Sequence, residues 1–328
     1  GTRDAEGGGT LNCGSPANLC GTAPSPAVPC FDMYAVRFDG ADETWATKLT
    51  SSSSALPPYS TSATGPSVYM IWWYAHHGRL ASDGENVAAY YGAAISVSQE
   101  SCINIHQGDR LNVISPSGSL VDSPDDFAWG CSHSGYEHVL WDEEESSFVA
   151  VCKTDNQNRI AFAPSITTIS PVDLAYSNLS DHVKADGGGY WVLSSDAREG
   201  EPALSNGIAE LHLLHFTDGL ADQDVVIAGS ADVNARAPHL ARYGDGLMSA
   251  TWETSSSPGD LGNQADRAMH LQVLDAADGT AVSEVIDVDL RGNRYQALRS
   301  FPDGSVAYPA PGSSNTKVKI LRALACAE

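Results

Sequence analysis

The sequence predicts an all-β protein of the β-propeller class, and three observations support this. Five segments repeat one pattern, a strand, a tight polar turn and an apolar strand. They begin about 50 residues apart, a period typical of propeller blades built from hairpins. Long amphipathic helical patterns are almost absent from the 328 residues, which argues against helical bundles and doubly wound folds.

The five repeated segments predict the inner hairpin of each blade. Their turns are short and polar, and several contain Asp-Gly, a strong hairpin signal between alternating strands. The segments are residues 77–92, 138–152, 182–193, 239–252 and 296–308.

Second hairpins, such as residues 32–49 and 271–282, lie between the inner ones. The first has no inner hairpin before it, and the last inner hairpin is followed by one clear strand, residues 317–324. We therefore predict that the N- and C-terminal strands share a blade and close the ring, which removes an open sheet edge. This gives five blades, or six if the N-terminal strands form their own; a β-sandwich is the alternative fold.

The cysteines predict an oxidising compartment. Three of the seven lie in a Gly/Pro-rich opening segment, which needs disulfides to hold it in place: Cys13, Cys20 and Cys30. We expect residues 1–31 to form a disulfide-pinned extension before a single propeller domain, residues 32–328. Cys131 and Cys152 lie near opposite ends of one predicted hairpin and could pair; buried free thiols are the alternative.

Location and partners follow from the cysteines and the charge. We expect a mature, secreted protein, extracellular or periplasmic, because the chain begins Gly1-Thr2 without a signal peptide. The 41 acidic and 18 basic residues give a net charge of -23, which excludes a basic nucleic-acid footprint and binding to an anionic membrane surface. No apolar run approaches the ~20 residues of a membrane-spanning helix. The expected partner is a small ligand or a glycan, bound by a monomer.

A histidine register is the main functional signal. Counting back four residues from the last residue before each turn aligns Arg79, His138, His182, His239 and Leu298. The innermost strands of a propeller line its channel, so these side chains are expected to form a ring. Neutral imidazoles ligate Zn or Cu, and protonated imidazoles with Arg79 would bind a carboxylate or sulfate. The alternative is that each histidine caps a strand end.

Further candidates surround this register. His77 and His133 are expected on the same rim, with His76, His106 and Tyr308 as more distant members. Trp72 and Trp73 suit sugar stacking, or belong to one buried strand. Acidic turns at 218–224 and 275–279 could bind Ca²⁺ through oxygen ligands, or are solvated turns. Asn178-Leu179-Ser180 is a glycosylation sequon, which matters only in a eukaryotic protein.

The repeats resemble the blades of secreted bacterial β-propeller repeat proteins, in which Asp-Gly joins two short strands. Residues 76–92 are also similar to the blade motif of propeller polysaccharide lyases and sialidase-like repeats, where a histidine begins the strand and an aromatic-Gly pair ends the hairpin. In those lyases His, Tyr and Arg transfer a proton at a uronate, which here implies His77, Arg79 and Tyr90 or Tyr91. The second histidine of the motif is missing: Ala93 and Ala94 stand there.

Three functions are consistent with these patterns. The first is a secreted propeller that binds a metal ion or small anion in a histidine-lined channel, through His138, His182 and His239 with His77, His133 and Arg79 nearby. The second is a polysaccharide-active enzyme, a lyase or hydrolase, using His, Arg and Tyr. The third is a lectin-like or interaction scaffold using Trp72 and Trp73. Histidine recurrence across blades favours the first.

Overall fold

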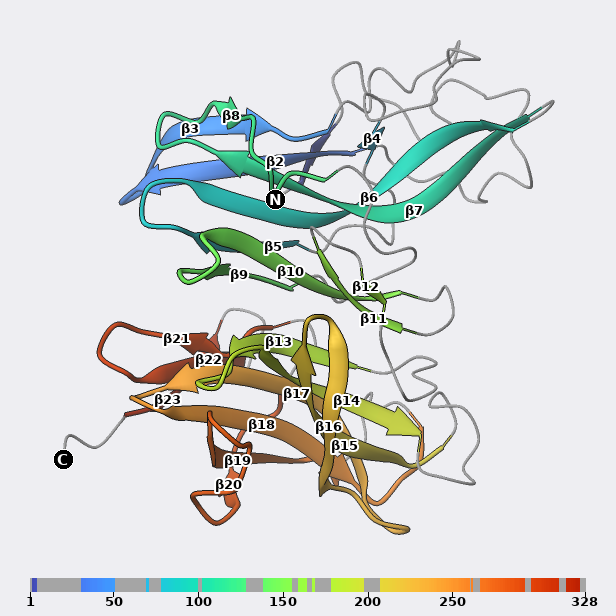
Figure 1. The fold of residues 1–328 in the computed structure, drawn as a ribbon, viewed down its shortest axis with the longest axis vertical. Helices are drawn as coiled ribbons and strands as arrows, with labels where there is room; N and C mark the ends of the chain where they lie inside the picture. Colours follow the sequence, from blue (N-terminus) through green and yellow to red (C-terminus); the bar gives the residue numbers. More distant parts are fainter. Residues whose placement is uncertain are drawn as a thin grey trace. The chain divides into compact units, whose positions relative to one another are not determined.

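A computed structural model describes most of the repeated region and little of the first 30 residues. The described residues are 2–4, 31–50, 69–70, 78–99, 102–127, 138–154, 159–163, 167–168, 178–197, 207–259, 261, 266–292, 296–312 and 317–324. All regular structure within these ranges is β-strand (Figure 1). They contain no helix long and apolar enough to cross a membrane.

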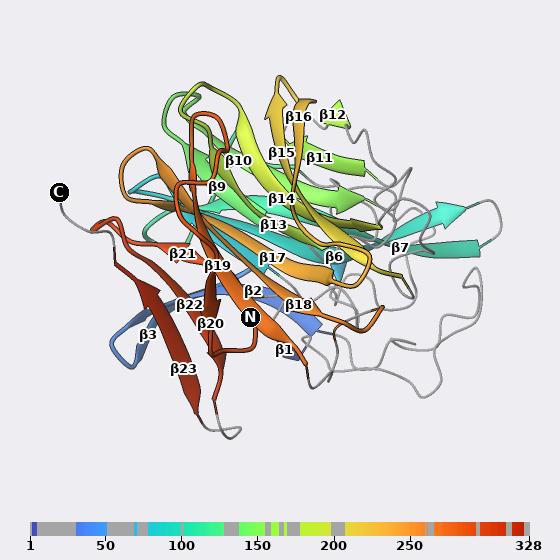
Figure 2. The same ribbon diagram turned by 90° about the horizontal axis from the view of Figure 1, so that it is seen from below.

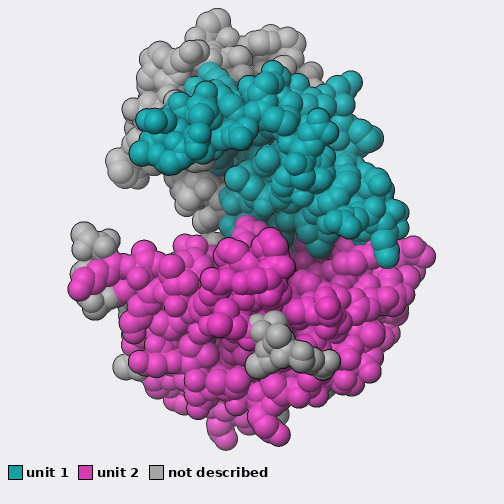
Figure 3. Space-filling view, turned by 90° about the vertical axis from the view of Figure 1, so that its left-hand side faces the viewer, with its two compact units in different colours: residues 1–154, 163–166 teal, residues 155–162, 167–328 magenta. Residues whose placement is uncertain are grey.

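The chain divides into two compact units, coloured separately in Figure 3. The first contains residues 1–154 and 163–166, and the second contains residues 155–162 and 167–328. Each unit is described by itself below.

The first unit consists of antiparallel strands paired mostly with their chain neighbours. One sheet has the order β1-β2-β3; a second has the order β4-β6-β7-β8, with β5 also paired to β6; and β9 and β10 form a hairpin. The bounds are β1 (Thr2–Asp4), β2 (Phe31–Asp39), β3 (Asp42–Lys48), β4 (Tyr69–Met70), β5 (Gly78–Ser82), β6 (Val87–Gln99), β7 (Cys102–Ile114), β8 (Leu120–Val121), β9 (His138–Asp142) and β10 (Ser147–Thr154).

The second unit contains two four-stranded meanders and a three-stranded one. Their orders are β13-β14-β15-β16, β17-β18-β19-β20 and β21-β22-β23, and β11 also pairs with β12. The bounds are β11 (Arg159–Ala163), β12 (Thr167–Thr168), β13 (Leu179–Lys184), β14 (Tyr190–Ala197), β15 (Ala209–Thr217), β16 (Leu220–Ala228), β17 (Asn234–Tyr243), β18 (Leu247–Ser255), β19 (Ala268–Asp275), β20 (Ile286–Val288), β21 (Arg299–Ser300), β22 (Val306–Pro311) and β23 (Val318–Ala323).

The predicted all-β class and the predicted inner hairpins are confirmed. The five repeated segments become the hairpins β5–β6, β9–β10, β13–β14, β17–β18 and β21–β22. The hairpins β5–β6, β13–β14 and β17–β18 are each continued by two further strands of the same sheet, which is the blade arrangement of a propeller. The count of five or six blades stays a prediction, as does the division at residue 31.

The predicted shared terminal blade is wrong for the described strands. β1, β2 and β3 form one sheet, while β21, β22 and β23 form another. Pairing in register with β2 already gives β1 a partner, so the N-terminal strands complete their own sheet. The C-terminal sheet is therefore one strand shorter than the two meanders before it.

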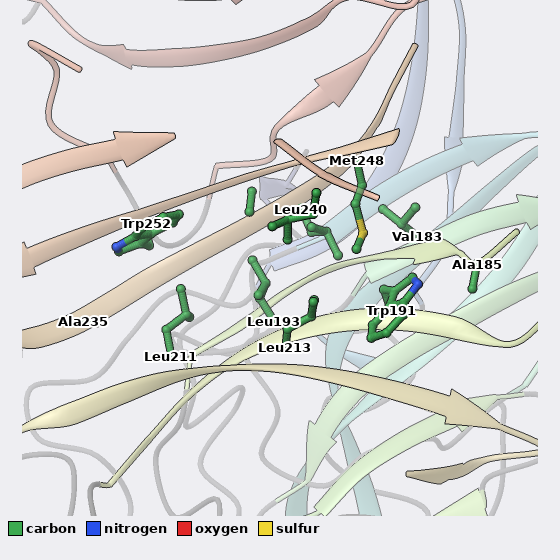
Figure 4. Close-up of a cluster of buried hydrophobic side chains, with 12 residues drawn as sticks. Val183, Ala185, Trp191, Leu193, Leu211, Leu213, Ala235, Leu240, Met248 and Trp252 are labelled. Atoms are coloured by element: carbon green, nitrogen blue, oxygen red, sulfur yellow. The ribbon is translucent and has the colours of Figure 1, made fainter. Parts of the chain in front are cut away.

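The two four-stranded sheets of the second unit pack against each other through apolar side chains that alternate along their strands. Trp191 and Leu193 on β14 lie on the same face of their sheet and enter one buried cluster with Leu240, Met248 and Trp252 of the next sheet (Figure 4). Burying each such side chain contributes about 1.5–3 kcal/mol.

The turn before β14 needs glycine at one position. Gly189 has a φ of +78°, and a Cβ there would lie 2.2 Å from the carbonyl oxygen of Phe216. The turn before β14 therefore requires glycine, because any other residue at position 189 would be strained.

Candidate functional site

Two register histidines, His182 and His239, occupy corresponding places on the first strands of their sheets in the second unit. In β13 the pairing with β14 is regular from His182 onward, after a bulge that follows Leu179. In β17 it is regular from His239 onward, after a bulge that follows Arg236. Each histidine is therefore the first residue after a β-bulge, which agrees with the equivalence proposed from the sequence. His138, the first residue of β9, is buried in the first unit.

The rings of His182 and His239 have different aromatic neighbours. His182 lies 6.1 Å from Phe162 and 5.6 Å from Tyr190 between ring centroids, both edge-on. His239 lies 4.9 Å from Tyr308. Both imidazoles are buried, so each is part of a local aromatic packing arrangement.

No metal centre is formed by the side chains that the structure describes. Among them there is no group of three His, Cys, Asp or Glu residues arranged to hold an ion. The acidic turns considered for Ca²⁺ use their carboxylates locally: Asp278 accepts hydrogen bonds from Thr280, and Asp222 binds His215. The predicted Zn, Cu or Ca²⁺ binding stays a prediction without a ligand group in this part of the chain.

The bulges themselves form the best candidate site. β13 and β17 are neighbours (Figure 2). The backbone N–H of Ala237 in the second bulge donates to Oδ1 of Asn178, the residue before β13, over 3.2 Å. Ala237 has a φ of +52°, a left-handed conformation that costs a non-glycine residue about 1–2 kcal/mol. We call Asn178, Asp181, Arg236, Ala237 and Glu253 the paired-bulge site.

Buried charges converge on the second bulge. Arg236 is 3% exposed; its Nε donates to Oδ1 of Asn234 over 2.8 Å and its Nη2 donates to the carbonyl of Gly207 over 2.9 Å. Directly across the strand pair lies Glu253, which is 1% exposed. Removing such charges from water costs several kcal/mol, which their hydrogen bonds must offset.

Glu253 is the centre of its own network. One carboxylate oxygen accepts a hydrogen bond from the backbone N–H of Gly292 over 2.6 Å, and the other forms an ion pair with Arg267. Arg267 also donates to the carbonyl of Gly292. Glu253 therefore holds Arg267 and the backbone at Gly292 in place, while it pairs in register with Arg236 across the two strands.

Asp181 is the more accessible carboxylate of the site. It lies in the bulge of β13, and its side chain is half-buried with Oδ2 inside the protein. Bulges often turn a side chain toward a functional site. A half-buried carboxylate can exchange a proton with a ligand, and a buried guanidinium can bind hydroxyl or carboxylate oxygens.

The glycosylation sequon falls on a structural residue. Asn178 is 4% exposed, and its Oδ1 accepts the Ala237 hydrogen bond. An N-linked glycan would be attached to Nδ2 of this buried side chain, so the folded protein does not present Asn178 as a modification site.

In the first unit the sheet selects Tyr90 as the partner of Arg79. Arg79 on β5 pairs in register with Tyr90 on β6, and the Tyr90 hydroxyl donates to Oδ2 of Asp109 on β7. Tyr91 points to the other face, where its hydroxyl is hydrogen-bonded to Asn112 and to the carbonyl of Leu49. Tyr91 therefore lies on the other face of the sheet from Arg79, because adjacent strand residues face opposite sides, and its candidate catalytic role stays a prediction.

Several predicted residues lie outside the described part. These are His76, His77, His133, Trp72 and Trp73; of His106 the structure gives only its place on β7, opposite Ile95. Cys152 is disulfide-bonded, and its partner also lies outside the described side chains, so pairing with Cys131 stays a prediction.

Sequence reasoning missed Asp181, Arg236 and Glu253. A signal existed for the first two: an asparagine precedes each histidine by four or five residues, with a charged residue between them, in 178–182 and 234–239. Pro238, inside an otherwise regular strand pattern, also indicates a bulge. Nothing in the sequence identified Glu253, whose importance depends on the pairing of β17 with β18.

Comparisons with known proteins give distant structural similarity alone. No protein-family model and no curated protein matches the chain. An endo-1,4-β-xylanase from Bacteroides thetaiotaomicron aligns with a TM-score of 0.40 at 12% identity, covering 76% of this chain and 89% of its own. A thermostable family-43 glycoside hydrolase aligns with a TM-score of 0.42 at 11% sequence identity, and the alignment covers 78% of this chain and 95% of that protein.

A third similar structure comes from a compost microbial metagenome. It is a family-43 β-xylosidase/α-arabinofuranosidase in complex with xylotriose, with a TM-score of 0.38 at 13% identity, covering 76% of this chain and 91% of its own. Similarity at this distance assigns neither a substrate nor a catalytic residue.

Proposed function

We propose that this chain is a carbohydrate-active enzyme that cleaves a glycosidic bond at the paired-bulge site. The observation that carries the proposal is that a hydrogen bond from Ala237 to Asn178 joins two bulged strands, with Asp181 in the first bulge and the Arg236–Glu253 pair beside the second. Strained backbone and buried charges both cost stability, and proteins retain them mainly where they serve a function.

The residue types suit a sugar substrate. Glycoside cleavage requires a carboxyl group that exchanges a proton with the glycosidic oxygen or with water. Sugar hydroxyls require donors and acceptors held in fixed positions, which arginine and carboxylate side chains provide. The described residues supply both kinds of group on neighbouring strands.

Each residue has a distinct role in this proposal. Asp181, the half-buried carboxylate of the set, protonates the glycosidic oxygen as its bond to the sugar breaks, and then accepts a proton from the water that bonds to the sugar carbon. Arg236 binds substrate oxygens and stabilises negative charge as the bond breaks. Glu253 and Asn178 are positioning residues: Glu253 faces Arg236 across the strand pair, and Asn178 holds the second bulge.

The test is an activity screen against neutral and uronic polysaccharides and aryl glycosides, followed by matched variants. Asp181→Asn and Arg236→Met should each reduce kcat at least about a hundredfold. Asp186→Asn and Arg242→Met are the controls, because they break a 2.6 Å surface ion pair at the other end of the same two strands. Full activity of both site variants, or equal losses in the controls, would contradict the proposal.

A second candidate reaction is suggested by the first unit. Arg79, Tyr90 and Asp109 lie on successive strands, with Tyr90 hydrogen-bonded to Asp109. A tyrosine base beside an arginine suits β-elimination at a uronate, because the base removes the proton alpha to the carboxylate and the cation stabilises the resulting charge. Elimination yields an unsaturated uronide that absorbs ultraviolet light, and hydrolysis does not.

Tyr90→Phe and Tyr91→Phe separate the two reactions. Both tyrosines are fully buried and hydroxyl-bonded, so the pair is matched for packing. Loss of unsaturated product in Tyr90→Phe alone would favour elimination. Retention of all activity in Tyr90→Phe would remove this candidate and leave hydrolysis at Asp181.

We also propose that the protein acts outside the cytoplasm. The disulfide bond of Cys152 supports this, because structural disulfides persist in oxidising compartments. Loss of folding stability under a reducing agent, measured against an untreated sample, is the expected result.

A further inference from the structure

In both four-stranded sheets of the second unit, the same kind of side-chain contact links the outermost strand to its neighbour. Imidazoles on the third strand bind carboxylates on the fourth. His212 and His215 on β15 bind Asp224 and Asp222 on β16, over 2.7 and 2.6 Å, and His270 on β19 binds Asp287 on β20, over 2.9 Å. In each of these sheets the fourth strand carries aspartates that contact histidines of the third strand, and a protonated histidine is a cation.

The C-terminal sheet has the third strand without the fourth. β23 pairs only with β22 among the described strands, so its other backbone edge has no partner strand within this part of the chain. Lys317 and Lys319 stand at this edge, exposed and without a carboxylate partner within the described residues. Val318 and Ile320 alternate with them and are 69% and 71% exposed.

The charge of this region is opposite to that of the rest of the chain. Residues 290–328 contain six of the 18 basic residues and two of the 41 acidic ones, Asp303 and Glu328. The sheet is locally positive in a protein whose net charge is -23. An acidic partner is therefore attracted to β23 more than to any other sheet of the second unit.

We propose that β23 is a docking edge for an extended acidic segment of a partner polypeptide, which adds the missing fourth strand. Backbone hydrogen bonds along the open edge would supply affinity. Carboxylates opposite Lys317 and Lys319, and apolar residues beside Val318 and Ile320, would supply specificity. This surface is separate from the paired-bulge site and does not depend on its function.

The chain contains a template for such a ligand in its own β20 region. Residues 283–290, Ser-Glu-Val-Ile-Asp-Val-Asp-Leu, alternate acidic and apolar side chains. The proposed probe is a fluorescent synthetic peptide of this sequence. Its binding to the full chain is to be measured by fluorescence anisotropy at low and at high salt. The expected result is saturable binding that weakens as salt rises.

Charge variants test the contact directly. A peptide with Glu284→Gln, Asp287→Asn and Asp289→Asn should bind at least about tenfold more weakly, the effect of a few surface charge pairs. The Lys317→Glu/Lys319→Glu chain should lose binding and regain it with a peptide carrying Lys at those acidic positions. Lys184→Glu, on the first strand of another sheet, is the control and should bind normally.

Three results would overturn the proposal. The first is absence of binding at low salt, and the second is equal binding of the acidic and neutral peptides. The third is slow hydrogen exchange, in the free protein, of the β23 amides that point away from β22, since it would mean that this edge is already paired by the chain itself or by a second copy.

Discussion

The backbone N–H of Ala237 donates to Oδ1 of Asn178 over 3.2 Å, so one side chain completes the hydrogen bonding of a bulge on the neighbouring strand. Ala237 lies in a left-handed conformation between Arg236 and Pro238. A bulge leaves its extra residue outside the regular ladder, and a buried N–H without a partner would cost about 1–3 kcal/mol. Asn178 therefore stabilises the local geometry on which the buried position of Arg236 depends.

Asn178→Ala should lower the free energy of unfolding by about 1–3 kcal/mol, because the Ala237 N–H loses its acceptor in a buried place. Urea denaturation at neutral pH measures the change. Asn86→Ala, in an exposed turn of the first unit, is the comparison, and its effect should be smaller. A denaturation midpoint unchanged by Asn178→Ala would mean that the hydrogen bond does not hold the bulge.

Ala237→Gly tests whether the left-handed backbone conformation at the same bulge is strained. Glycine adopts a φ of +52° without the steric cost that alanine has, but it also makes the unfolded chain more flexible. The two effects oppose each other, and the expected net change is stabilisation by up to about 1 kcal/mol. Ala235→Gly, two residues earlier in the same strand, should be destabilising. Destabilisation of similar size in both variants would contradict strain at Ala237.

The hairpins could be predicted from the sequence, but the direction of side chains beyond a bulge could not. Short polar turns between apolar runs identify β9–β10, β13–β14 and β17–β18 because turn chemistry and alternation are local properties. A bulge shifts the alternation by one residue, so counting back from the turn predicts the face of His239, which precedes no bulge on the way to the turn, but not that of Arg236, which lies beyond the bulge. The contact of His239 with Tyr308, and that of His182 with Phe162, followed only from the pairing of distant strands.

Asp126 should make the stability of the first unit fall as pH rises. Burial raises the pKa of this carboxyl from 3.8 to about 6, with further help from the charges of Asp122 and Asp125, against a hydrogen bond from the Val113 N–H and the charge of Arg110. A raised pKa means that the folded state favours the neutral acid. Its contribution to stability is complete below about pH 4 and is lost as pH rises through about 6.

Asp126→Asn removes this titration and keeps an oxygen that can accept from Val113. Relative to the wild type, the variant should gain roughly 1–2 kcal/mol between pH 4 and pH 7, a range reduced for solvent screening. Thermal unfolding across this pH range measures it. If the difference in stability between the wild type and Asp126→Asn stayed constant across this pH range, the pKa of Asp126 would not be raised by folding.

Asp266 should have the opposite pH dependence. Hydrogen bonds from the Ser256 hydroxyl, the Ser256 N–H and the Ser255 hydroxyl lower its pKa to about 2. The stabilisation is present above the ordinary value of 3.8 and is lost as pH falls through about 2. Asp266→Asn should therefore lower the melting temperature at pH 7, and the difference should shrink between pH 4 and pH 2. Asp245→Asn, on an exposed turn, is the control and should leave the melting temperature unchanged.

Asp222→Asn should loosen the outermost strand of its sheet. Burial acts to raise the pKa of Asp222, but hydrogen bonds from His215 and Thr217 outweigh it and lower the pKa. Its stabilisation is therefore present above pH 4 and lost at lower pH. Because the side chain is exposed, the expected cost at pH 7 is below about 1 kcal/mol. Faster hydrogen exchange should appear in the amides of β16 and be absent from those of β18. Equal acceleration in both strands would mean a global loss of stability, and would remove the argument that a carboxylate on the fourth strand attaches it to the third.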